Sequence, residues 1–464
     1  DILMIFSLPA LVSVLAVFAV LKEGLFSIGT QKQVEDEPYG SARLCSAQEA
    51  ISKNDKNGLP LGRILSSVKG DDINLIDKIK FSKIGEIFRY DPIHSFLIAP
   101  TRSGKGVGFV IPTLLDYDGP VICIDPKSAE NYTITSRHRS KNGTRKVYAF
   151  DTCNATGQPT AKINVFDFID ADSPKFIDEV KFLATSLFPL TGNSHQDFFT
   201  VASQDIFMCL FSVVSRFNKS KRNLSVLYDI LMQPSEGFVE FLEDISLNSD
   251  DPNGTAPRLA NKILATDPRE RSGGITGIKQ GLGFLESPIY REMVKESNFD
   301  LNEVFENKAD LFFCIPSKEI KGYGKYFIRL VFPFIVNAIK DLPHPPKKKV
   351  LFLVDEMANI GRIESVDDIL LEGSGYGIKF VGIAQTLSSL KEIYPKEIET
   401  ITSSSLLMFL GLKSIEDREY VARFLGHKTI FSESDSTNER DSHSNTGHTK
   451  TAVKREILTP NELG

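Results

Sequence analysis

The stretch SFLIAPTRSGKGVGFV, residues 95–110, decides the fold. An apolar run that predicts a strand leads into a loop containing glycine, and the loop leads into a run that predicts a helix with Pro112 near its first turn. In such a unit the backbone N–H groups of the loop and of the helix start point at one spot and can bind a phosphate group. The stretch therefore predicts a phosphate-binding loop, in which Lys105 reaches the β- and γ-phosphates of a nucleotide.

The loop departs at two positions from the usual pattern of Gly, four residues, Gly-Lys and then Ser or Thr. Ala99 stands in place of the first glycine and Gly106 in place of the hydroxyl residue. A bound Mg²⁺ would then lack one hydroxyl ligand and would rely on phosphate oxygens, waters and a carboxylate, which Mg²⁺ tolerates because it keeps several waters. We therefore interpret the stretch as a working nucleotide-binding loop, formed by Ala99, Pro100, Thr101, Arg102, Ser103, Gly104, Lys105, Gly106 and Val107.

Six further apolar runs predict strands: residues 120–127, 145–151, 309–316, 348–356, 378–385 and 405–413. The runs are continuously apolar rather than alternating, as expected of strands that are buried on both faces of a parallel sheet. From residue 176 to residue 300, apolar residues recur at every third or fourth position, which predicts amphipathic helices. The polar segment 432–451 is predicted to be a mobile loop. The fold class is therefore α/β, with a parallel-rich sheet and an inserted all-α domain.

Polar side chains stand at the ends of several of these strands. The run KKVLFLVDE ends in Asp355 and Glu356, which is the form of a Walker B strand: the first acid holds Mg²⁺ and the second polarises the attacking water. Another run ends in Gln385, whose amide could sense the γ-phosphate or orient water, and a third ends in Asp125. Open α/β sheets bind ligands at this edge. We therefore predict Lys105, Glu356 and Gln385 as catalytic residues and Asp355 as the Mg²⁺ ligand.

The N-terminal residues 2–21 carry no charged side chain and are long enough to cross a hydrocarbon core of about 30 Å. A signal peptide would have a shorter apolar region, a basic start and a cleavage site of small residues. We therefore predict a transmembrane helix. Because the first residue is Asp rather than Met, we expect the sequence to be an excerpt of a longer protein.

Composition restricts the partners and the compartment. The net charge of −6 excludes a general positive field that would attract nucleic acid, so any such contact must come from a local patch or from a channel made by assembly. The five cysteines lie far apart without a paired spacing, and the seven histidines show no zinc-binding spacing. These features predict a reduced compartment and no structural metal.

The combination of these features resembles the type IV secretion coupling proteins, the TraG/TraD-like membrane-anchored ATPases of conjugation and related secretion systems. The resemblance rests on the apolar N-terminal run and on GSAR (40–43), APTRSGKG (99–106), DPK (125–127), LFLVDEMANIGRI (351–363) and GIAQTLSSL (382–390). It implies a RecA-like P-loop motor domain that uses ATP and Mg²⁺. It also implies a homohexamer in the bacterial inner membrane, with the motor domain in the cytoplasm.

The resemblance also implies partners and domain boundaries. The partners are the inner-membrane components of the secretion system, and a relaxase–DNA complex, protein effectors or both as cargo. A neighbouring subunit would supply a basic residue to the site, for which Lys379, Arg362 and Arg329 are candidates. The predicted divisions are a transmembrane helix (1–22), a linker with the start of the nucleotide-binding domain (23–90), the first part of that domain (91–175), the all-α domain (176–300) and the second part (301–464).

Two alternatives to a secretion motor remain. A double-stranded DNA translocase of the septal type shares the RecA-like core, although GSAR and the position of the helical insert favour the coupling protein. A docking scaffold that binds nucleotide without turnover should have lost the loop lysine or the catalytic acid, whereas Lys105 and Glu356 are both present. The cargo stays open because basic residues of the insert either contact nucleic acid or form a solvated face: Lys219, Lys221, Arg222, Arg258, Lys262, Arg269 and Arg271.

Overall fold

The computed structural model describes residues 4–6, 14–17, 40–45, 49, 52–56, 58–63, 87–190, 192–249, 251–438 and 445–464. The chain divides into two compact units. The first unit combines Asp1–Tyr117 with Ile383–Gly464, and the second is Asp118–Gly382.

The second unit contains five parallel strands. They are β6 (Val121–Ile124), β7 (Lys146–Asp151), β8 (Ala309–Cys314), β9 (Val350–Val354) and β10 (Ile378–Ala384), in the spatial order β10-β9-β6-β8-β7. Every residue of β6, β8, β9 and β10 is buried, which explains why these strands are continuously apolar. Ile124 of β6 pairs with Val354 of β9 and with Phe313 of β8, so the three strands end at one level. The predicted parallel strands are confirmed.

The first unit contains the remaining two predicted strands, β5 (His94–Ile98) and β11 (Leu406–Leu410), which pair in parallel. The last residues of β10, Ile383 and Ala384, belong to this unit. The Ala99 N–H donates a hydrogen bond of 2.8 Å to the Ala384 carbonyl, which joins the end of β5 to the end of β10. The described residues of this unit include the α-helices α2 (Ile111–Asp116), α16 (Leu387–Ile393), α17 (Ile398–Ser404) and α18 (Ile415–Leu425).

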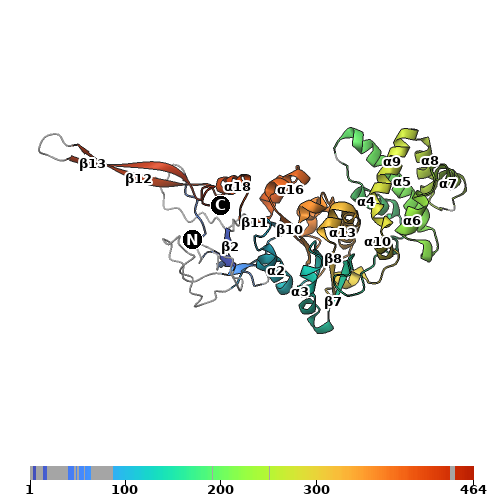
Figure 1. Cartoon of the computed structure of the whole chain (residues 1–464), viewed down its shortest axis with the longest axis horizontal. Helices are drawn as coiled ribbons and strands as arrows, with labels where there is room; N and C mark the ends of the chain where they lie inside the picture. The colour runs from blue at the N-terminus through green and yellow to red at the C-terminus, as the bar shows by residue number, and fades with distance from the viewer. Residues whose placement is uncertain are drawn as a thin grey trace. The chain divides into compact units, whose positions relative to one another are not determined.

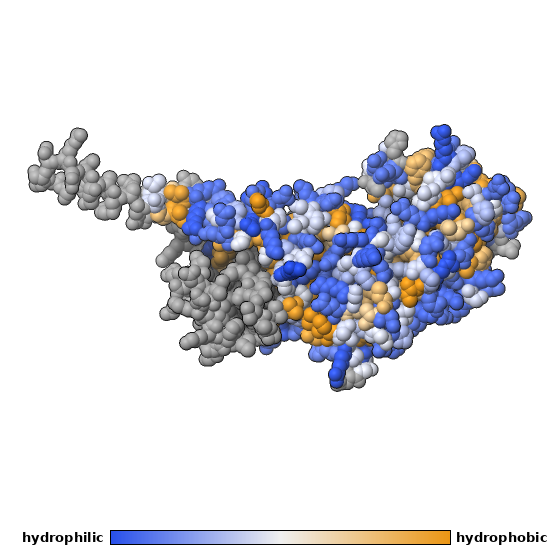
Figure 2. Space-filling view, viewed as in Figure 1, coloured by the Kyte–Doolittle hydropathy of each residue, from blue (hydrophilic) through white to orange (hydrophobic). Residues whose placement is uncertain are grey.

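Between β7 and β8 the described residues form helices and no strand. The α-helices are α4 (Phe176–Leu187), α5 (Ser194–Ser215), α6 (Leu224–Leu231), α7 (Ser235–Asn248), α8 (Thr255–Ala265), α9 (Pro268–Gly281), α10 (Pro288–Met293) and α11 (Leu301–Phe305). Figure 1 shows α5, α6, α8 and α9 packed as one group. On the face drawn in Figure 2 this helical region is largely hydrophilic, with apolar residues in small separate groups. We call residues 176–300 the helical insert; its predicted boundaries stay a prediction.

The helical insert is organised by a close contact between α5 and α9. A Cβ atom added at Gly274 of α9 would lie 2.7 Å from the Cβ of Ala202 on α5. At Gly277 such an atom would lie 2.3 Å from the Oγ of Ser203, which itself donates a hydrogen bond to the Gly274 carbonyl. The two helices therefore approach closely only because α9 presents glycine at these positions.

The membrane helix predicted for residues 2–21 is not confirmed. Most of those residues lie outside the described part of the chain, and the described pieces are two short antiparallel strands, β1 (Met4–Phe6) and β2 (Val14–Val17). Among the described residues, one helical stretch, Gln196–Ser215 in α5, is long and apolar enough to cross a membrane. It is 67% buried inside the protein, as the core helix of a folded domain would be.

The mobile loop predicted for residues 432–451 is wrong over the residues that the structure describes. They form most of a hairpin of two twelve-residue strands, β12 (His427–Asn438) and β13 (Asn445–Glu456), drawn as a long ribbon in Figure 1. Polar residues such as Ser432 and Thr451 face each other along the ladder, so the apolar signal of a strand is missing from the sequence. A second, shorter pair joins β3 (Leu59–Arg63) to β4 (Ile87–Tyr90).

Candidate active site

The predicted phosphate loop follows β5 in the first unit and has an unusual backbone. Arg102 and Gly104 adopt left-handed conformations, with φ of 64° and 83°, and the Ser103 N–H donates to the Pro100 carbonyl at 3.2 Å. A π-helical turn, Gly106–Val110, begins directly afterwards and continues into α2. A left-handed conformation at a residue other than glycine costs about 1–3 kcal/mol and is concentrated at functional sites. The strand, the tight loop and the immediate helix start form the arrangement that phosphate-binding loops require.

Three side chains of this loop are buried, namely those of Ala99, Ser103 and Lys105, with exposed fractions of 0%, 6% and 7%. Among the described residues the Ser103 hydroxyl has no hydrogen-bond partner. A buried polar atom without a protein partner is uncommon and indicates a place for a ligand atom or a water. The other residues predicted to bind nucleotide are half-buried or exposed: Pro100, Thr101, Arg102, Gly104, Gly106 and Val107.

Gln385 lies beside the start of this loop. It directly follows Ala384, whose carbonyl accepts the hydrogen bond from Ala99, and its side chain is exposed. Thr386 then caps α16, because its hydroxyl accepts a hydrogen bond of 3.1 Å from the Ser389 N–H. The cap fixes where β10 ends and the helix begins, so Gln385 occupies a defined position at the carboxyl edge.

Asp355 and Glu356 lie in the second unit, directly after β9. Asp355 is 1% exposed, and its Oδ1 accepts a hydrogen bond of 2.9 Å from the Glu356 N–H. Glu356 adopts a left-handed conformation, φ 53° and ψ 43°, at the start of the short helix α14 (Met357–Ile360). The strained turn directs the two neighbouring carboxylates differently, so that one is buried and the other is partly exposed.

Asp125, at the end of β6, is fully buried. Its carboxylate accepts hydrogen bonds from the Tyr132 N–H at 3.0 Å and from the Asn131 side-chain amide at 3.3 Å, and so caps α3 (Glu130–Arg139). Burial raises the pKa of Asp125 to about 6, and the charge of Asp355 acts in the same direction. Such a shift is typical of a carboxylate that is buried in a low-dielectric place near another carboxylate.

The pairing of β6 with β9 makes these two carboxylates neighbours. Asp125 and Asp355 follow Ile124 and Val354, which are partners in the ladder. Within the part of the chain that the structure describes, no three His, Cys, Asp or Glu side chains are grouped to hold a metal by themselves. Mg²⁺ is commonly bound by one or two carboxylates, with waters and substrate phosphates completing the shell. The donor set therefore fits an Mg²⁺ ion that is held jointly with a nucleotide.

Two residues at this edge escaped the sequence interpretation. Asn359 donates a hydrogen bond of 2.7 Å from Nδ2 to Oε2 of Glu356, and the Oγ of Ser317 lies 3.1 Å from the same oxygen. Ser317 comes three residues after the end of β8. Asp125 and Gln385 were predicted because they stand at strand ends. The same rule, applied to the run 309–316, would have pointed to Ser317.

Three basic residues were considered as the group that a neighbouring subunit supplies to the site. In this chain each of them is buried or makes contacts within the chain. Lys379 is 3% exposed inside β10. The Arg362 guanidinium donates to Glu364 at 2.9 Å and also pairs with Asp367. Arg329 donates to a backbone carbonyl at 3.0 Å. These contacts favour structural roles for all three in the isolated chain.

The basic residues of the helical insert are partly engaged as well. Lys262 pairs with Asp205 at 2.7 Å, while Arg258 and Arg271 donate to backbone carbonyls at 2.9 Å and 3.1 Å. Their contacts favour the solvated-face interpretation over a dedicated nucleic-acid surface.

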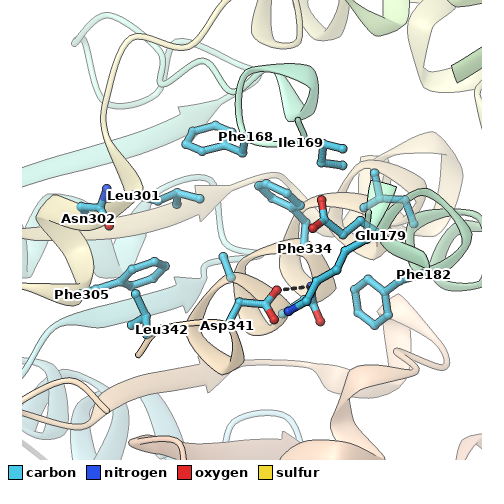
Figure 3. Close-up of a pocket in the computed structure, with 14 residues that line it drawn as sticks. Phe168, Ile169, Glu179, Phe182, Leu301, Asn302, Phe305, Phe334, Asp341 and Leu342 are labelled. Atoms are coloured by element: carbon cyan, nitrogen blue, oxygen red, sulfur yellow. Dashed lines mark hydrogen bonds between the residues drawn. The ribbon is translucent and has the colours of Figure 1, made fainter. Parts of the chain in front are cut away.

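A pocket of about 300 Å³ opens in the second unit between α4, α11 and α13 (Lys325–Lys340). In Figure 3 aromatic side chains surround the carboxylates of Glu179 and Asp341, and Asp341 accepts a hydrogen bond of 3.0 Å from Asn337. Burial raises the pKa of Glu179, and the charge of Asp341 adds to the effect. None of the residues predicted for the active site lines this pocket, so it is separate from the carboxylates that follow β6 and β9.

Comparison with known proteins agrees with this geometry. Residues 61–464 match the model of a family described as type IV secretory system conjugative DNA transfer. The chain is 26% identical over 344 residues to protein VirD4 of Rhizobium radiobacter, covering 73% of this chain and 48% of the relative. It is 26% identical over 395 residues to conjugal transfer protein TraG of Escherichia coli, covering 80% and 61%. The chain thus spans about half the length of VirD4.

Solved structures share the fold. The bacterial conjugative coupling protein TrwB lacking its first 70 residues, in a trigonal form with sulphate, superposes with a TM-score of 0.63 at 16% identity, covering 92% of this chain and 89% of that chain. TrwB in complex with ADP and Mg²⁺ gives a TM-score of 0.58 at 18% identity, covering 80% and 79%. The α/β architecture with parallel strands and helices fits a RecA-like fold. On the strength of the family match, which takes in both the loop and the strand-end acids, the chain belongs to the type IV secretion coupling proteins of conjugative DNA transfer.

Proposed function

We propose that this chain is the ATP-hydrolysing motor of a coupling protein, which drives relaxase-bound single-stranded DNA, effector proteins or both into a type IV secretion channel. The observation that carries the proposal is the buried Lys105, held in a tight loop between a buried strand and a helix start. The family match supports the secretion context. The solved complexes of TrwB with ADP and Mg²⁺ and with a non-hydrolysable ATP analogue support ATP as the nucleotide.

Binding of the nucleotide is assigned to the loop. Backbone N–H groups from Gly104 to Val107 and the ammonium group of Lys105 bind the phosphates, and the Ser103 hydroxyl contributes a buried donor. Gly106 has no side chain to offer to a metal. Asp355, assisted by the neighbouring Asp125, is the group that would hold Mg²⁺, with waters and phosphate oxygens as the other ligands. Bound Mg²⁺ would neutralise charge on the β- and γ-phosphates.

Hydrolysis is assigned to Glu356 and Gln385. Glu356 accepts a proton from the water that attacks the γ-phosphorus, while the bond from that phosphorus to the bridging oxygen breaks and ADP leaves. The exposed Gln385 amide orients that water or contacts the γ-phosphate.

Assembly and location complete the proposal. The protein would form a homohexamer at the bacterial inner membrane, with its motor in the cytoplasm and with the inner-membrane components of the secretion system as partners. The support is the family membership together with the uncharged N-terminal run 2–21, which is long enough for a membrane span.

A binding experiment tests the nucleotide assignment. Lys105→Ala should weaken Mg²⁺–ATP binding by about 10- to 100-fold, since hydrogen bonds to charged groups are worth about 1.5–3 kcal/mol. The matched control is Lys391→Ala, which removes an exposed lysine of α16 and should leave the affinity unchanged. Titration calorimetry measures both. Equal ATP affinity in the Lys105→Ala variant and the parent would show that the loop does not bind the phosphates.

A further inference from the structure

The carboxylate of Glu356 is held by a serine of the neighbouring chain segment. Ser317 begins the one-turn helix α12 (Ser317–Glu319), and its N–H donates to the Pro126 carbonyl at 2.9 Å. Its hydroxyl lies 3.1 Å from Oε2 of Glu356 and 3.2 Å from that same carbonyl. A hydroxyl has one proton and can donate it to one of the two acceptors at a time. A charged carboxylate is the stronger acceptor, so Ser317 holds Glu356 while the backbone bond fixes the position of the serine.

Asn359 supplies the second contact. It lies one turn after Glu356, and its Nδ2 donates to Oε2 at 2.7 Å. The two donors converge on one carboxylate oxygen, which sets both the rotamer and the plane of the carboxylate. Because the backbone of Glu356 is already fixed in a left-handed conformation, these contacts determine where its second oxygen points.

The same one-turn helix is attached to the helical insert. Glu319, two residues after Ser317, accepts hydrogen bonds of 3.2 Å from the Tyr290 hydroxyl and from the Cys153 thiol. Tyr290 belongs to α10, is 3% exposed, and packs against the Phe327 ring at 5.4 Å. Burial, followed by the charge of Glu319, raises the pKa of Tyr290 well above its ordinary value, so the hydroxyl stays a donor. Helix α12 thus contacts the insert through Glu319 and the Walker B acid through Ser317.

A close approach limits how α12 can move. A Cβ atom added at Gly324 would lie 3.0 Å from the Tyr290 hydroxyl and 3.0 Å from the Glu319 carbonyl. Gly324 therefore lies in close contact with Tyr290 of α10, and the Tyr290–Glu319 hydrogen bond gives a displacement of α10 a route to Ser317, two residues before Glu319. Packed elements transmit such shifts because they are not freely deformable.

We propose that Ser317 and Asn359 are positioning residues for Glu356, and that the Tyr290–Glu319 contact lets the helical insert set the rate of hydrolysis. The inference rests on the proposed function, because it gives the insert a means of regulating the same acid. An insert that has engaged cargo would shift α10, and with it the orientation of the water-polarising carboxylate.

Steady-state ATP hydrolysis by the full chain tests this inference. Ser317→Ala should lower kcat by about 10- to 100-fold, the usual cost of losing an orienting partner, and leave KM within about twofold. Ser317→Thr, which keeps the hydroxyl, should restore most of the rate. Tyr290→Phe keeps the ring and should give a smaller fall in kcat, and the double variant should match Ser317→Ala alone, because both act through one helix.

Controls separate this inference from the proposed function. Ser246→Ala removes a hydroxyl from α7 of the insert, where it contacts the Asn261 side-chain oxygen at 2.8 Å and not α10, and should leave kcat unchanged. If the parent hydrolyses ATP and Glu356→Gln does not, the proposed function stands. In that case, an unchanged kcat in Ser317→Ala, or additive effects of Tyr290→Phe and Ser317→Ala, overturns the positioning inference alone. A parent that does not hydrolyse ATP overturns both.

Discussion

Asp125 shows how one buried side chain links stability to ligand chemistry. Its pKa is raised from an ordinary 3.8 to about 6, chiefly by burial. Between these values the folded state binds more protons than the unfolded state, so the free energy of unfolding falls as the pH rises through about 6. We expect Asp125→Asn to remove this dependence, because the amide is never charged. When the pH is raised from 4.5 to 7.5, the free energy of unfolding of the variant should increase by about 1–3 kcal/mol relative to that of the parent.

Urea unfolding at the two pH values, without nucleotide or metal, measures this difference. Asp178→Asn, which neutralises an exposed carboxylate in the first turn of α4, is the matched control and should show little change with pH. The difference in free energy of unfolding between Asp125→Asn and the parent could instead be the same at both pH values. That result would mean that folding does not raise the pKa of Asp125.

The positions of the candidate residues at strand ends were predictable from the sequence, whereas their roles stay predictions. Strands that end in polar side chains led to the predictions for Asp355, Glu356 and Gln385 because a parallel sheet brings its carboxyl ends to one edge. Ser317 was missed because the strand-end rule was not applied to the run 309–316, and Asn359 was not predicted because nothing in its spacing singles it out. Their contacts with Glu356 depend on the left-handed turn at that residue, which sequence patterns do not reveal.

At the level of secondary-structure elements, the contact between α5 and α9 holds the helical insert together. We expect Gly274→Ala to lower the free energy of unfolding by about 1–3 kcal/mol, because the added methyl group would overlap Ala202 at 2.7 Å. Gly237→Ala in α7 is the matched control, since its added atom meets only a flexible Gln233 oxygen at 3.7 Å. There the gain in helix propensity should stabilise the protein by up to about 1 kcal/mol. Thermal unfolding measures the Tm of both variants. A shift of both Tm values in the same direction would contradict the close-packing account.

The strands and the hairpin show which elements a sequence reveals. All seven apolar runs became strands, because burial on both faces demands continuous apolar sequence. The hairpin of β12 and β13, a ladder of twelve residue pairs, was missed because its sequence is polar and lacks the apolar pattern of a strand. The helical insert was recognisable from its three- and four-residue spacing, whereas its glycine-mediated packing depends on which helices meet.

At the scale of the whole molecule, the proposal requires assembly. A basic residue from a neighbouring subunit is proposed to complete the site, and the contacts of Arg362 and Arg329 and the burial of Lys379 make these three residues poor candidates for it. Such a residue can be worth about 10³–10⁵ in rate. We therefore expect the ATP hydrolysis rate per chain to rise steeply with protein concentration, in step with the mass measured by light scattering. A dilute monomer with full activity per chain would rule out a site completed by a neighbour.

The central claim is that this coupling protein is a motor that hydrolyses ATP with Glu356. The most direct measurement is steady-state phosphate release by the parent and by Glu356→Gln, at a concentration where the parent is active, with ATP binding measured in parallel. Glu392→Gln, which neutralises an exposed glutamate of α16, is the control. We predict that Glu356→Gln binds ATP like the parent but releases phosphate at least about 100-fold more slowly. The amide keeps the shape of the carboxylate but cannot accept the proton. Phosphate release by Glu356→Gln at the parental rate would contradict the account.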